Sequence, residues 1–174
     1  MHPDTMRLID RWVGIPLCFF ASFWPLKKAQ ADSNSTLATN IPPPDTIVFI
    51  LIAEIGALVV AYPAIKETRK QHPKSRICFI TAPAGLQTLE LMGFEKEDIF
   101  LLETSSIKSL LKGIVNIRSH FKGKRVSAIV LEPFTRFSTL LSAWIGASKR
   151  IGCYRFLNEG LYLGNILKIG RAHV

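Results

Sequence analysis

Apolar residues from Thr46 onward form short runs that alternate with longer stretches of helical spacing. Residues Thr46–Ala53 read TIVFILIA, a continuous β-branched and apolar run typical of a strand buried on both faces of a parallel sheet. Four later runs also predict strands: Arg76–Thr81, Ile99–Leu102, Val126–Leu131 and a fifth beginning at Arg150-Ile-Gly152. Strands that alternate with helices predict an α/β fold on a parallel sheet, with Thr46–Ala53 as its central strand.

Helical stretches separate these strands. The first, from Gly56 to Lys70, contains Pro63, where the helix should kink or restart because proline lacks the amide hydrogen that a helix needs. Two others should end at a glycine: Leu86–Met92 at Gly93, and Phe134–Ile145 at Gly146.

One helix is expected after Thr104, Ser105 or Ser106, any of which could cap its first turn. Its apolar residues fall three or four positions apart, with lysines between them, which predicts an amphipathic helix lying on the sheet. These apolar positions are Ile107, Leu110, Leu111, Ile114 and Ile117.

The chain before the first strand has a different pattern. An apolar run extends from Trp12 to Trp24, with Pro16 inside it. A membrane-spanning helix needs about 20 apolar residues, so this shorter run is better suited to an interfacial helix with tryptophan at both edges. Basic residues flank the run and would attract anionic lipid: Arg7, Arg11, Lys27 and Lys28.

Two alternatives for this segment stay open. It could be a secretory signal with a cleavage site near Ala29-Gln-Ala31, although the preceding lysines are unusual there, or it could be an ordinary packed helix. We assign residues 1–28 to a membrane-associating segment. Residues 29–45, rich in Ser, Thr, Asn and Pro, are assigned to a linker.

The composition of the chain limits the kinds of molecule that we expect it to bind. The chain has 22 Lys and Arg against 13 Asp and Glu, a net charge of +9. No zinc-finger spacing and no aromatic RNA-binding strand accompany this charge, so we expect no nucleic-acid partner and favour a membrane surface or a phosphorylated ligand. Cys18, Cys78 and Cys153 are far apart in the sequence. We expect them to be buried thiols in a reducing compartment. Scattered histidines and cysteines predict no metal site, and no cofactor is expected.

Ligands of doubly wound sheets bind outside the carboxyl ends of the strands, which directs attention to the loops there. Four loops carry possible ligand groups: Glu54–Ala57, Ala82–Gly85, Glu103–Ser106 and Glu132–Ser138. The sequence contains no G-x-G-x-x-G fingerprint, no P-loop and no G-x-S-x-G elbow, which disfavours classical nucleotide binding and serine hydrolysis.

The order of several short motifs resembles glycosyltransferase family 9, the lipopolysaccharide heptosyltransferases. The motifs are Glu54-Ile-Gly-Ala57, Ala61-Tyr-Pro-Ala-Ile65, His72-Pro-Lys-Ser-Arg-Ile77, Arg136-Phe-Ser138 and Arg150-Ile-Gly152. The likeness covers roughly residues 46–167 and only the first half of such an enzyme. It implies a Rossmann-like N-terminal domain of a two-domain GT-B enzyme, facing a lipid-linked saccharide acceptor. The ADP-sugar donor would bind to a C-terminal domain beyond these residues.

Transfer in that family is inverting, and a carboxylate after the first strand is thought to act as general base on the acceptor hydroxyl. The family usually has Gly-Asp there, whereas this chain has Gly56 followed by Ala57. Glu54 lies in the same loop and is the candidate catalytic residue; otherwise it is a charge at the helix start.

The resemblance also suggests residues that bind substrate. Gly56 would allow a ligand close to the backbone, or simply form a tight turn. Arg136 and Ser138 would form a phosphate or carboxylate site at a helix start. For each charged residue, solvation or capping is the structural alternative. The candidates are Gly56, Glu132, Arg136, Ser138, Arg150 and Arg155.

The last residues, 168–174, coincide with the translation of a common sequencing adapter and are interpreted as an artefact. We therefore expect an inactive fragment of a sugar transferase that works at the cytoplasmic face of a bacterial membrane. A non-catalytic domain that binds a saccharide or partner is the alternative, and a membrane tether for an assembly is a third.

Overall fold

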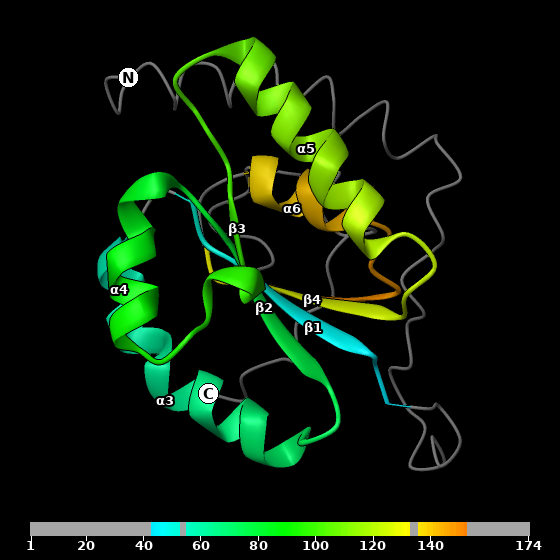
Figure 1. The fold of residues 1–174 in the computed structure, drawn as a ribbon. Helices are drawn as coiled ribbons and strands as arrows, with labels where there is room; N and C mark the ends of the chain where they lie inside the picture. The colour runs from blue at the N-terminus through cyan, green and yellow to red at the C-terminus, as the bar shows by residue number, and fades with distance from the viewer. Residues whose placement is uncertain (1–42, 53–54, 133–135, 153–174) are drawn as a thin grey trace, which may run out of the picture.

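The computed structural model describes residues 43–52, 55–132 and 136–152, which form an α/β domain (Figure 1). Five strands make one sheet in the order β3-β2-β1-β4-β5, and every neighbouring pair is parallel. Their bounds are β1 Thr46–Ile50, β2 Arg76–Thr81, β3 Ile99–Leu101, β4 Val126–Val130 and β5 Lys149–Ile151. The prediction of a parallel α/β sheet with its first strand in the centre is confirmed.

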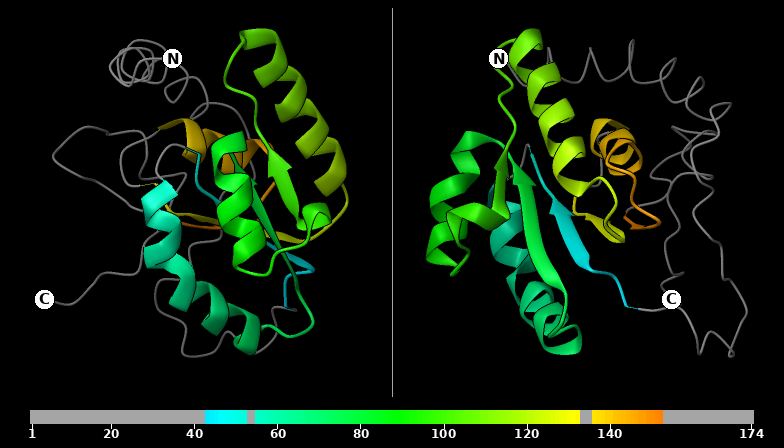
Figure 2. Two further views of the ribbon diagram at one scale, coloured as in Figure 1. Left: turned by 60° about the vertical axis from the view of Figure 1, so that its left-hand side comes forward. Right: turned by 45° about the vertical axis from the view of Figure 1, so that its right-hand side comes forward.

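Helices cover both faces of this sheet. The helices are α3 Ile55–Gln71, α4 Leu86–Leu91, α5 Ile107–Phe121 and α6 Arg136–Trp144, with short 3-10 turns at Pro83–Gly85 and Lys96–Asp98. Helices α3 and α4 pack on one face, and α5 and α6 pack on the other (Figure 2). The domain therefore has the three-layer arrangement of a doubly wound fold.

Strand β1 supplies both halves of the core. Val48 and Ile50 point into the cluster under α5 and α6, whereas Ile47 and Phe49 point into the cluster under α3 and α4. All of β1 is buried, and the ring of Phe49 stacks on that of Phe79 with centroids 5.3 Å apart. Each such buried apolar side chain contributes about 1.5–3 kcal/mol, which explains why this strand is apolar on both faces.

Helix α3 runs through Pro63. The helix does not restart there but continues over 17 residues, from Ile55 to Gln71. Proline leaves the carbonyl group one turn earlier, at Val59, without a helical donor. Val59 is exposed, so water can hydrate that region, while Leu58 and Ile65 anchor both halves of the helix in the core.

Helix α5 has the predicted cap but not the whole predicted contact face. Ser106 is the capping residue, and its hydroxyl oxygen accepts the Ser109 N–H at 3.2 Å. Ile117 and Phe121 are buried against the sheet. Ile107 and Leu111, which we expected to face the sheet, are exposed instead. The helix therefore buries only part of its apolar surface.

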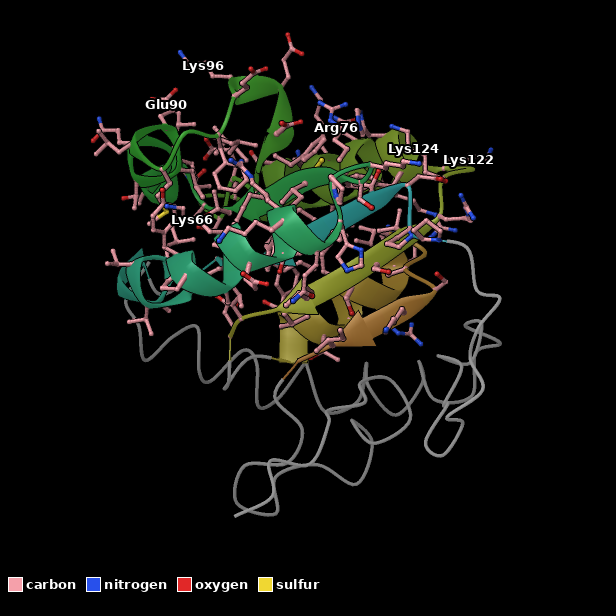
Figure 3. All side chains as sticks on the ribbon, turned by 90° about the horizontal axis from the view of Figure 1, so that it is seen from below. Lys66, Arg76, Glu90, Lys96, Lys122 and Lys124 are labelled. Atoms are coloured by element: carbon pink, nitrogen blue, oxygen red, sulfur yellow. The ribbon has the colours of Figure 1, made fainter. Side chains whose placement is uncertain are left out.

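Charged side chains link neighbouring strands at the amino edge of the sheet. Asp45 binds Arg125 through a 2.7 Å ion pair and accepts the Arg125 backbone N–H, which ties the start of β1 to the start of β4. These hydrogen bonds lower the pKa of the Asp45 carboxyl. Arg76, Lys122 and Lys124 lie on this side of the domain (Figure 3). Some of the positively charged side chains of the domain therefore lie at the amino edge of the sheet, away from its carboxyl edge.

Cys78 lies in β2 and is fully buried, as predicted for a structural thiol. Burial raises its pKa to about 11, so the nucleophilic thiolate form is scarce at neutral pH.

Some sequence assignments cannot be compared with this structure. The segment 1–28, most of the linker 29–45 and residues 168–174 lie outside the described residues, as do Glu54 and Arg155. Across 43–52, 55–132 and 136–152, every helix is too short or too polar to cross a bilayer.

Candidate functional site

The strand order places a topological switch point between β1 and β4. The connection after β1 leads to α3 on one face, and the connection after β4 leads to α6 on the other. The two chain segments therefore separate where the strands end, which is the position at which doubly wound folds bind ligands. Helices α3 and α6 both begin at this carboxyl edge, so the positive ends of their dipoles lie there.

Glu132 bridges the two sides of the switch point. It follows β4, its side chain is only 4% exposed, and its Oε1 accepts the Ile52 backbone N–H at 2.7 Å. Its Oε2 accepts the hydroxyl of Ser138, a fully buried residue in the first turn of α6. One carboxylate thus joins the loop after β1, the end of β4 and the start of α6.

The carboxylate of Glu132 holds the chain segments at the switch point in position. Hydrogen bonds to an ionised carboxylate are stronger than those between neutral groups. A buried charge also costs several kcal/mol unless donors satisfy it. Glu132 receives such donors from both loops, which gives it a structural role at the switch point. Its predicted role in binding substrate remains a proposal.

Gly56 lies exposed in the first turn of α3. A Cβ atom built there would have no atom within 4 Å, and its φ is not in the left-handed region. The packing of this domain therefore does not require glycine at residue 56, and the open space is available to a ligand. The next residue, Ala57, packs against the cluster that contains Leu58 and Ile65.

Two of the basic candidates, Arg136 and Arg150, lie within the described residues, in different parts of the domain. Arg136 is the first residue of α6 and so lies at the switch point. Arg150 is buried halfway along β5, an edge strand of the sheet, level with Ala128 on the face that α6 covers. Burial lowers the pKa of the Arg150 guanidinium. Of the described candidates, Gly56, Glu132, Arg136 and Ser138 share the carboxyl edge, whereas Arg150 lies halfway along the edge strand β5.

One participant was missed by reasoning from sequence. The Ile52 amide binds Glu132 across 80 residues of chain, and no local pattern marks it.

Gly85 ends the loop Ala82–Gly85, which the sequence indicated as a possible ligand loop and whose Pro83-Ala-Gly85 is a typical turn composition. Gly85 packs so tightly on β2 that an added Cβ would lie 2.4 Å from the Thr81 Oγ1 atom.

Within the described part of the chain, no group of three or more His, Cys, Asp or Glu side chains could hold a metal ion. No family model, curated protein or solved structure matches this chain.

The Glu132 bridge predicts a large loss of stability on truncation. Glu132→Ala removes the acceptor from two buried donors, which should lower the free energy of unfolding by about 2–4 kcal/mol. Ser138→Ala should cost less, about 1–2 kcal/mol, because Ile52 keeps its acceptor. Urea unfolding at pH 7 measures both. Glu103→Ala, at an exposed glutamate after β3, is the control and should stay within about 0.5 kcal/mol of the parent. Equal effects at Glu132 and Glu103 would disprove the bridge.

Gly56 and Gly85 should respond oppositely to the same change. Gly56→Ala should stabilise the domain by about 0.4–1 kcal/mol, since the methyl group meets open space and the unfolded chain loses freedom. Gly85→Ala should destabilise it by about 1–3 kcal/mol, because the methyl group would collide with Thr81. Thermal unfolding of the two variants tests this contrast, and a destabilised Gly56→Ala protein would contradict it.

Proposed function

We propose that this domain is the acceptor-side half of a glycosyltransferase that moves heptose or a related sugar onto an acidic, lipid-linked saccharide of the lipopolysaccharide type. The nucleotide-sugar donor, an ADP-sugar, would bind to a second domain in a GT-B arrangement. The reaction would take place at the inner face of a bacterial cytoplasmic membrane. By itself the fragment would bind acceptor without transferring sugar.

The observation that carries this proposal is the position of the motifs relative to the switch point. Gly56, from the first motif, lies in the first turn of α3, and Arg136-Phe-Ser138 begins α6. These two motifs are far apart in sequence but follow the neighbouring strands β1 and β4. The proposal thus rests on motif order together with a strand order suited to ligand binding.

The chemistry of the carboxyl edge suits an acidic acceptor. The first turns of α3 and α6 present backbone N–H groups and positive dipole ends, which favour phosphate or carboxylate groups. Arg136 adds a basic residue to the same edge. Glu132 fixes the two loops relative to each other, so an acceptor could be held without reorganising them.

Catalysis needs a base that removes the proton from the acceptor hydroxyl as its oxygen attacks the anomeric carbon. We assign this role to Glu54, in the loop between β1 and α3, with the nucleotide leaving from the opposite face of the sugar. Ala57 cannot serve, since it has no titratable group and packs on the apolar core.

One observation favours a second candidate function. The position that usually carries the family's aspartate is held here by Ala57, which is partly buried against an apolar cluster. A domain with this substitution could hold a saccharide and catalyse nothing. The two functions differ in whether Glu54 is needed for sugar transfer.

Acceptor binding is the first test. The full chain should bind a phosphorylated acceptor oligosaccharide, and Arg136→Ala should weaken binding about tenfold, the loss expected for one charge-assisted contact. Lys122→Ala is the matched control, because it removes an exposed positive charge at the opposite edge and should leave affinity unchanged. Isothermal titration calorimetry measures both. Equal weakening in the two variants would indicate non-specific charge attraction and contradict the proposal.

Catalysis is tested separately. The reading frame of the source locus should be determined beyond the Leu167 codon, and the extended protein assayed for transfer from an ADP-sugar. Glu54→Gln should lower kcat at least about a hundredfold, as for loss of a general base, with little change in acceptor affinity. Transfer that survives this substitution would remove Glu54 as the base, and absence of transfer in the extended parent protein would favour the binding function.

A further inference from the structure

Helix α5 carries an exposed apolar stripe. Ile107, Leu111 and Val115 lie four residues apart, so they project from one side of the helix. Their exposed fractions are 78%, 57% and 53%. They lie beside, and not within, the buried face formed by Ile117 and Phe121. The sheet therefore leaves one apolar side of this helix in water.

Helix α6 extends this surface. Trp144, at the end of α6, is 46% exposed. Arg118, one turn after Val115, donates to the Trp144 carbonyl, and its guanidinium lies 5.1 Å from the centroid of the Trp144 ring. Trp144 thus continues the apolar stripe from α5 to α6. We call these four residues, Ile107, Leu111, Val115 and Trp144, the α5–α6 face.

Positive side chains border this face. Lys108 and Lys112 follow Ile107 and Leu111 in sequence and are exposed. Long lysine side chains can lay their methylene groups along apolar surface and extend their ammonium groups to lipid phosphates. Exposed aliphatic residues, bordering lysines and a tryptophan are the composition of helices that lie in the membrane interface.

We propose that the α5–α6 face docks on an anionic membrane surface. The positive charge of Lys108 and Lys112 favours a membrane on this face over segment 12–24 or a second copy of the chain. The apolar segment 12–24 is flanked by Arg7, Arg11, Lys27 and Lys28, which Lys108 and Lys112 would repel. A second copy of the chain, paired symmetrically, would bring the same lysines together. Anionic headgroups match both the apolar stripe and its lysines.

This surface is independent of the proposed sugar transfer and of segment 1–28, because it rests only on residues of α5 and α6. Ile107 begins α5, which follows the carboxyl end of β3. The most exposed residue of the face therefore lies toward the edge that carries the switch point. Docking would bring lipid headgroups toward that edge.

The test uses the full chain with Trp12→Phe and Trp24→Phe, so that Trp144 is the only remaining tryptophan. Vesicles of phosphatidylcholine with phosphatidylglycerol should shift its emission to shorter wavelength, and brominated lipid should quench it. Pure phosphatidylcholine should bind about tenfold more weakly, because the lysines then lose their anionic partners.

Substitutions locate the contact. Ile107→Glu with Leu111→Glu should raise the concentration of anionic vesicles needed to quench Trp144 at least about tenfold, since two inserted apolar groups become charged. Leu91→Glu is the matched control, because Leu91 is 90% exposed on α4, in the opposite layer, and should not affect binding. Thermal unfolding of all variants checks that each one folds.

Three results would overturn the proposal. Sedimentation with vesicles without a response of Trp144 would show that other residues attach the chain. Equal binding to neutral and anionic vesicles would remove the role of the lysines. A change in Trp144 emission or in elution volume on substitution, without vesicles, would show that the chain itself or a second copy covers this face.

Discussion

The burial of β1 on both faces, with a parallel neighbour on each side, is the constraint on which the rest of the domain depends. Its five residues are buried, and its backbone pairs with β2 and β4 in continuous register. Successive side chains enter opposite core clusters, so each helical layer packs on the same strand. A polar residue in the middle of β1 would remove apolar contacts from the cluster on that face.

The same constraint creates the switch point and the need for Glu132. The connections after β1 and β4 leave toward opposite faces of the sheet. The carboxylate of Glu132 accepts hydrogen bonds from both sides, and hydrogen bonds fix direction better than apolar contacts can. A rigid edge of this kind is suited to hold a ligand in one orientation.

The proposals assign different partners to two parts of one domain. The carboxyl edge offers helix N-termini for the acidic groups of a saccharide, whereas the α5–α6 face offers apolar residues and lysines for lipid. An acceptor that is itself a lipid-linked saccharide would extend from one to the other. The basic character of the chain agrees with both partners, because both are anionic.

Most helices and strands could be predicted from the sequence, because the periodicity of apolar residues reflects local backbone geometry. The sequence predicted β2 with both bounds correct and placed the first strand at the centre, although pairing in β1 ends at Ile50 and not at Ala53. Which residues meet, and which remain in water, could not be predicted in this way. The Glu132–Ile52 bond, the burial of Arg150 and the exposure of Ile107 depend on how distant elements pack, and no local pattern encodes that packing.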